Sequence, residues 1–100
     1  MKAVLNNTVV AEAPEEELVK IEGNWYFPPA RVNTALLEDS DTPYRCPWKG
    51  DCQYFNVRDG DRLRADLAWS YPNPIPASFD RVGRDYSGYV AFSNEVQISQ

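Results

Sequence analysis

Short apolar runs separated by turn dipeptides are the feature that most limits what this chain of 100 residues can fold into. Within residues 2–12, two β-branched or apolar runs flank Asn6-Asn7, and asparagine tolerates the positive φ of a two-residue hairpin turn. Two further turn dipeptides lie between such runs: Asp59-Gly60, between 51–57 and 62–71, and Ser93-Asn94, within 89–99. This pattern predicts three antiparallel hairpins.

The segment between the first two hairpins predicts more varied structure. Residues 17–27 have a strand pattern that Gly23-Asn24 breaks or turns. Pro29 suits the first turn of a helix, and Val32 and Leu36 lie four apart, so we expect a short helix over 29–37. Residues 39–50 are rich in Asp, Ser, Thr and Pro and are expected to form a loop.

The segment before the last hairpin contains three prolines at every second position, which favours an extended path across the surface over residues 72–76. A turn of helix is expected near residues 77–82. No strand–helix–strand alternation is present, so the sequence predicts an all-β fold of mostly antiparallel short strands with one or two short helices, in a single domain over residues 1–100.

Charge and histidine content exclude several classes of function. The net charge is −5, which disfavours nucleic-acid binding because that requires a basic surface. No histidine is present, and this removes the commonest general base and the commonest metal ligand. Two cysteines alone do not complete a zinc site, so we expect neither a metal nor another cofactor. The N-terminal run is neither a signal peptide nor a membrane span, and we expect a soluble, cytoplasmic protein with reduced thiols and no membrane partner.

The stretch RCPWKGDCQYF, residues 45–55, contains the first candidate for chemistry. Cys46 lies near Arg45 and Lys49, and a neighbouring cation lowers the pKa of a thiol and activates it. The alternative is that Cys46 is buried and packs as a small apolar residue, which the sequence favours. Lys49-Gly50 lacks the upstream glycines of a phosphate-binding loop, so a nucleotide site is not indicated.

Several tryptophans and tyrosines fall beside prolines or at predicted strand ends, where they form either core or a pocket. Each has a large apolar face and one polar atom, which suits stacking on a flat or cationic group. The acidic residues, by contrast, have no spacing that identifies a catalytic pair.

Four blocks of the sequence, in this order, carry a family resemblance: EGNWYFPPARV, SDTPYRCPWKGDCQYF, LAWSYPNPIPA and GYVAF. Together they resemble the domain-of-unknown-function 427 family, also labelled nucleotidyltransferase family nine. The resemblance implies a small all-β domain similar to the β-tent folds of methionine sulfoxide reductase B and cereblon. Those relatives often carry zinc on paired CxxC motifs, which this sequence lacks. Nucleotidyl transfer normally needs clustered carboxylates, and none is apparent at the matching blocks.

The matching blocks contain residues whose recurrence is hard to explain by folding alone. The candidate ligand-binding residues are Tyr26, Cys46, Trp48, Lys49, Trp69 and Tyr71. The favoured hypothesis is a binding module for a small ligand or peptide, with Lys49 supplying a cation and Cys46 packed beneath. One alternative is a structural or adaptor subunit that docks on a larger protein assembly through an aromatic or strand-edge surface. A second alternative is an enzyme with Cys46 as nucleophile and Lys49 as its activating cation.

Overall fold

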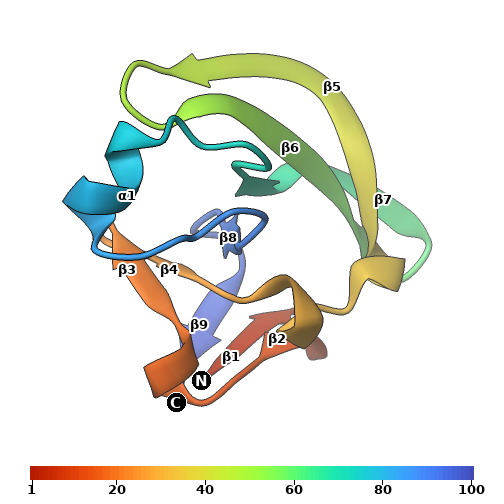
Figure 1. Cartoon of the computed structure of the whole chain (residues 1–100). Coiled ribbons are helices and arrows are strands. Elements are labelled where there is room, and N and C mark those ends of the chain that lie inside the picture. The colour runs from red at the N-terminus through yellow and green to blue at the C-terminus, as the bar shows by residue number, and fades with distance from the viewer.

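The computed structural model describes residues 1–100 and has nine strands, one short α-helix and three 3-10 turns (Figure 1). The strands are β1 (Lys2–Leu5), β2 (Thr8–Glu12), β3 (Val19–Ile21), β4 (Asn24–Tyr26), β5 (Leu37–Cys46), β6 (Gly50–Asp59), β7 (Arg62–Ser70), β8 (Val90–Phe92) and β9 (Gln97–Ser99). The helix α1 spans Ala77–Val82, and the 3-10 turns are Glu15–Glu17, Pro29–Arg31 and Thr34–Leu36. All strand pairings between named strands are antiparallel, which confirms the all-β class with one short helix.

The strands form three sheets that enclose the core. A four-stranded sheet has the order β5-β6-β7-β8, a three-stranded sheet has the order β2-β1-β9, and β3 and β4 form a separate hairpin. In Figure 1 the long strands β5, β6 and β7 arch over the molecule, and β1, β2 and β9 lie on the opposite side. The helix α1 lies beside the β5–β6 connection, above the β3–β4 hairpin.

The turn dipeptides behave as predicted in the first two hairpins. Asn6 and Asn7 have φ values of 45° and 69° and connect β1 to β2. Gly60 has a φ of 60° in the β6–β7 connection. Positive φ at these positions is tolerated by asparagine and glycine because of their short or absent side chains. The hairpin in residues 17–27 turns at Glu22-Gly23, one residue before the predicted break.

The predicted helix over residues 29–37 is wrong. Pro29 does begin a helical turn, but Pro29–Arg31 and Thr34–Leu36 are isolated 3-10 turns, and Leu37 already starts β5. Val32 lies between them in extended conformation and forms a bridge to Ala11. The pairing of Val32 with the first hairpin therefore overrides its weak helical spacing.

The predicted loop over residues 39–50 is also wrong for most of its length. Residues up to Cys46 belong to β5, an edge strand in the order β5-β6-β7-β8. All nine of its residues before Cys46 are exposed or only partly buried, and these include Pro43 and the polar side chains around it. An exposed edge strand needs no apolar alternation and tolerates proline, so its sequence looks like a loop.

The third predicted hairpin, within residues 89–99, does not form. The strand β8 pairs with β7, whereas β9 pairs with β1 in a different sheet. The turn near Asn94 therefore carries the chain from one sheet to the other. The apolar residues Val90, Phe92 and Val96 are buried, and they pack against partners far away in the sequence.

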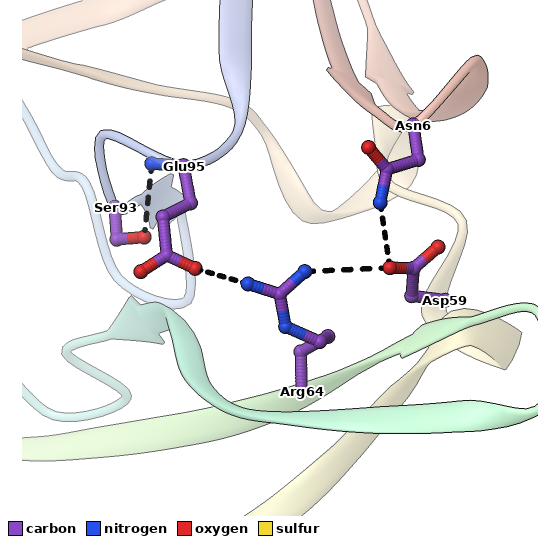
Figure 2. A network of polar contacts seen from close by, with 5 residues as sticks. All are labelled: Asn6, Asp59, Arg64, Ser93 and Glu95. Carbon is purple, nitrogen blue, oxygen red and sulfur yellow. Dashed lines mark hydrogen bonds and ion pairs between the residues drawn. The ribbon is translucent and has the colours of Figure 1, made fainter.

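A polar network joins the β8–β9 connection to the β1–β2 and β6–β7 hairpin turns (Figure 2). Arg64 of β7 donates to Asp59 at 3.3 Å and also to Glu95, just before β9. Asn6 donates to the same carboxylate oxygen of Asp59 at 2.7 Å. Arg64 thus links the β6–β7 hairpin, the β1–β2 turn and the β8–β9 connection.

The buried apolar side chains divide into two clusters. The larger one has fourteen residues, including Phe27 and Phe92, whose rings meet edge-on with centroids 5.8 Å apart. The smaller one has seven buried residues: Val19, Ile21, Tyr26, Cys46, Tyr71, Tyr86 and Ala91. The smaller cluster lies under the β5–β6 connection and contains three of the six candidate residues, while Trp48 and Trp69 pack against it. The single α-helix, α1, has six residues and is too short to span a membrane.

Candidate functional site

The β5–β6 connection is a three-residue loop that presents Trp48 and Lys49. Cys46 and Gly50 pair at its base, and Gly50 has a φ of 108°, which favours glycine. A side chain at Gly50 would also contact Ile75, since an added Cβ would lie 3.4 Å from Ile75 Cγ1. The Ile75 amide donates to the Lys49 carbonyl at 2.9 Å, which ties the loop to the proline-rich segment.

Lys49 is the most unusual residue of the site because its side chain is buried. It is 5% exposed, and its ammonium forms an ion pair with the Glu22 carboxylate at the tip of the β3–β4 hairpin. The ammonium also lies 4.8 Å from the centroid of the Tyr71 ring and 5.2 Å from that of Trp48. Aromatic faces and a carboxylate thus replace water around the cation, as a buried charge requires.

Glu22 is the partner that sequence reasoning missed. Its φ is 54°, a left-handed conformation that is uncommon for glutamate, and its side chain is about half exposed. The hydrogen bond from Lys49 holds the pKa of this carboxyl below its usual value, with further contributions from Trp48 and Arg81. The Gly23-Asn24 pair beside it marked a turn, but nothing in the sequence linked that turn to Lys49.

Tyr26 and Trp69 are joined beneath the loop. The Trp69 indole donates to the Tyr26 hydroxyl at 3.0 Å, and Tyr26 meets the edge of Tyr86 with ring centroids 6.4 Å apart. Tyr26 is 1% exposed, and burial raises its pKa to about 12. Burial also raises the pKa of Tyr71 above its usual range. These tyrosines are therefore neutral structural groups at ordinary pH.

Tyr86 is a second residue missing from the sequence-based set. It is fully buried, donates to Ser78 at 2.8 Å, and packs edge-on against Phe79 of α1. Ser78 in turn donates to the Ile75 carbonyl at 2.7 Å. This chain of contacts fixes α1 against the smaller cluster.

The two thiols lie in the same region, one of them buried and the other half buried. Cys46 is 5% exposed within the smaller cluster, and Cys52 is half buried at its edge. Burial raises the pKa of Cys52, and Tyr71 and Lys49 offset this only in part. A raised pKa disfavours the thiolate, which is the nucleophilic form.

Arg81 of α1 completes the surface around Trp48. Its guanidinium carbon lies 4.1 Å from the centroid of the Trp48 ring, and the residue is exposed. It forms no salt bridge within the chain. The prediction of a helix near residues 77–82 was the available signal, but it did not identify which side chain faces the loop.

Two hollows adjoin the Trp48–Arg81 pair. The larger, about 360 Å³, is lined by Pro47, Trp48, Ile75, Ala77, Ser78 and Arg81. The smaller, about 260 Å³, is lined by Lys20, Ile21, Glu22, Trp48, Arg81 and Val82. Among the six candidate residues only Trp48 lines these hollows. The other five, Tyr26, Cys46, Lys49, Trp69 and Tyr71, lie together beneath it as a supporting layer.

No group of three or more His, Cys, Asp or Glu side chains is placed to hold a metal ion.

No curated protein matches the chain. One family profile, described as a domain of unknown function (DUF427, NTP_transf_9), matches residues 1–99. That match covers nearly the whole chain and agrees with the resemblance of the CPWKG, AWSYPNPIP and YVAF blocks. The chain therefore belongs to the DUF427 family.

Proposed function

We propose that this domain binds a small ligand in the hollow beside Trp48, and that the ligand has a flat apolar body and one anionic group. The observation that carries the proposal is the stacking of Arg81, which forms no salt bridge, on Trp48 at the junction of two hollows. The larger hollow has a volume within the range of small-molecule sites.

The shape and lining of the larger hollow support an apolar ligand body. Pro47, Trp48, Ile75 and Ala77 contribute apolar surface, and the Ser78 hydroxyl is already engaged by Tyr86 and Ile75. Arg81 is the one charged residue among the six that line it. A ligand there gains stacking and apolar burial from the loop and pairs its anionic group with the guanidinium.

The charges around Trp48 support an anion over a cation. Lys49 and Arg81 bring two positive charges, and Glu22 brings one negative charge, which leaves the group at +1. The Lys49 charge is already compensated by Glu22, so we assign the contact with the ligand to Arg81 rather than to Lys49. Lys49 instead positions Trp48 from below.

Calorimetric titration with a matched pair of probes tests the proposal. Naphthalene-2-carboxylate and naphthalene-2-carboxamide have the same flat body and differ in charge. We expect the acid to bind with a Kd of roughly 1 mM, which is ordinary for a ligand of that size, and about tenfold more tightly than the amide. Arg81→Gln should remove the preference for the acid, and Trp48→Leu should weaken both probes.

Arg62→Gln is the matched control, because Arg62 is exposed on β7 and forms no salt bridge. It changes the net charge by the same amount as Arg81→Gln, so a general electrostatic effect would appear in both variants. Equal binding of acid and amide, or a preference that survives Arg81→Gln, would contradict the proposal.

The thiol-enzyme alternative receives no support from the geometry, because Cys46 is buried in the smaller cluster and burial raises the pKa of Cys52. The adaptor alternative has one observation in its favour, the exposed strand β9 at the edge of its sheet.

A further inference from the structure

The smaller hollow beside Trp48 is bordered by cations from two different elements. Its volume is about 260 Å³, and both Lys20 of β3 and Arg81 of α1 line it. In Figure 1, α1 lies above the β3–β4 hairpin, which brings the two elements together. Because Trp48 and Arg81 also line the larger hollow, the two hollows adjoin along this pair. An anionic group bound by Arg81 therefore lies beside the smaller hollow.

Lys20 and Arg81 form no salt bridge, although the chain has 15 acidic and 10 basic residues. Both residues are exposed. The Lys20 ammonium lies 5.1 Å from the centroid of the Trp25 ring, as the Arg81 guanidinium lies over that of Trp48. An aromatic face stabilises an exposed cation only weakly, so both positive charges remain available to an anion.

Glu22 is the one acidic residue that lines the smaller hollow, and its charge is already compensated. Its Oε1 accepts a hydrogen bond from the buried ammonium of Lys49. With that pair neutral, Lys20 and Arg81 leave a charge of +2 at the hollow. A ligand with a single negative charge neutralises only half of it.

We propose that the anionic group of the ligand is the dianionic phosphate of a phosphate monoester, which Arg81 and Lys20 bind together in the smaller hollow. This inference rests on the proposed function, since the flat body of the ligand still occupies the larger hollow. A phosphate monoester carries between about 1.5 and 2 negative charges at pH 7. A guanidinium bonds two phosphate oxygens at once, and a lysine ammonium follows the phosphate on its flexible four-carbon stem.

Two probes with the same flat body separate a dianion from a monoanion. Naphthalen-2-yl phosphate and naphthalene-2-sulfonate both present a tetrahedral oxyanion, but the sulfonate carries one charge at any ordinary pH. In calorimetric titration at pH 8, we expect the phosphate to bind about tenfold more tightly than the sulfonate. Inorganic phosphate lacks the flat body and should bind at least about tenfold more weakly than the ester.

The preference for the phosphate should depend on pH through the ligand itself. The second pKa of a phosphate monoester is about 6, so at pH 5 the ester is mostly a monoanion and should bind no more tightly than the sulfonate. The charged side chains that line the hollow are Lys20, Glu22 and Arg81, with Lys49 behind Glu22. Lysine and arginine titrate at about pH 10 and above. The lowered pKa of Glu22 keeps its carboxylate mostly ionised at pH 5.

Lys20→Gln tests the second cation from the protein side. We expect it to weaken the binding of naphthalen-2-yl phosphate about tenfold and to leave that of naphthalene-2-carboxylate within about twofold of the parent. Lys20→Arg should keep the preference for the phosphate. Arg62→Gln removes one positive charge elsewhere on the surface and is the matched control. Because Lys20 is exposed, the melting temperature of each variant should stay within a few degrees of the parent.

Four results would overturn the inference. They are equal binding of the phosphate and the sulfonate at pH 8, a preference that persists at pH 5, a preference that survives Lys20→Gln, and binding of inorganic phosphate as tight as that of the ester. If naphthalene-2-carboxylate still binds more tightly than its amide, only the inference fails. If the carboxylate shows no such preference, the proposed function fails and the inference fails with it.

Discussion

Lys49 and Glu22, 27 residues apart, form an ion pair in which the ammonium is buried and the carboxylate is about half exposed. Because of this asymmetry, loss of one partner should lower the stability of the folded protein more than loss of the other. If Glu22 is lost, a buried cation remains without its carboxylate, whereas if Lys49 is lost, the carboxylate remains in contact with water. The pair also joins the tip of the β3–β4 hairpin to the loop that carries Trp48.

Glu22→Gln should destabilise the protein by about 2 kcal/mol at pH 7. Breaking a fully buried ion pair costs roughly 3–5 kcal/mol. The expected loss is smaller here because Glu22 is half exposed. The folded pKa of Glu22 is lowered from 4.5, so its contribution is present above pH 4.5 and is lost as the pH falls through the folded pKa. Urea denaturation of both proteins from pH 7 to pH 3 measures this. The two curves should converge at low pH, and a constant gap would contradict the assignment.

Lys49→Met should be milder than Glu22→Gln. Methionine fills the space between Tyr71 and Trp48 without a charge to compensate, and it leaves Glu22 solvated. We expect a change in unfolding free energy within about 1 kcal/mol of the parent, as measured by urea denaturation at pH 7. A loss larger than that of Glu22→Gln would show that Lys49 contributes more than charge compensation.

Tyr26→Phe should show how the contribution of Tyr26 to protein stability changes at alkaline pH. The change removes the acceptor of the Trp69 indole and should cost about 1 kcal/mol at pH 8. The pKa of Tyr26 is raised from 10.0 to about 12 in the folded state, so its contribution is complete below pH 10 and is lost as the pH rises from 10 to about 12.

Denaturation at pH 8, 10 and 11.5 compares the parent with Tyr26→Phe. The parent should lose its advantage over the variant as the pH rises, because the variant has no hydroxyl to ionise at this position. The other tyrosines with raised pKa values, Tyr54, Tyr71 and Tyr86, are common to both proteins and cancel. Parallel loss of stability in both proteins would mean that Tyr26 ionises normally.

Short sequence patterns predicted the parts of the fold whose backbone conformation depends on the residues within them. Asn6-Asn7 and Asp59-Gly60 determine their own backbone conformation, so the hairpins around them were predictable. The strand β5 was not, because an exposed edge strand carries polar residues and Pro43, as a loop does. The crossover between β8 and β9 depends on partners in β7 and β1, and no pattern near Ser93 reports those.

For the candidate site, the grouping of the residues could be predicted from the sequence, but their exposure could not. Its aromatic residues were identified together, and the structure places all six candidates in or against one cluster. Their exposure was not predictable, because whether Lys49 is buried depends on Glu22, which is distant in the sequence. Arg81 was missed since a short helix can direct a side chain to any side, and only packing of Phe79 on Tyr86 fixes its rotation.

The three tryptophans make a direct test of the proposed function possible, because each indole N–H gives its own resonance. Trp48 lines the proposed ligand hollow, Trp25 lines a different hollow beside residues 97–100, and the Trp69 indole donates a hydrogen bond to Tyr26. Nitrogen–proton correlation spectra recorded during addition of naphthalene-2-carboxylate separate them. We expect the Trp48 signal to shift with added acid while Trp25 and Trp69 stay in place, and the shift to be lost in Arg81→Gln. Binding of the acid with an unmoved Trp48 signal, or with the shift at Trp25 instead, would contradict the account.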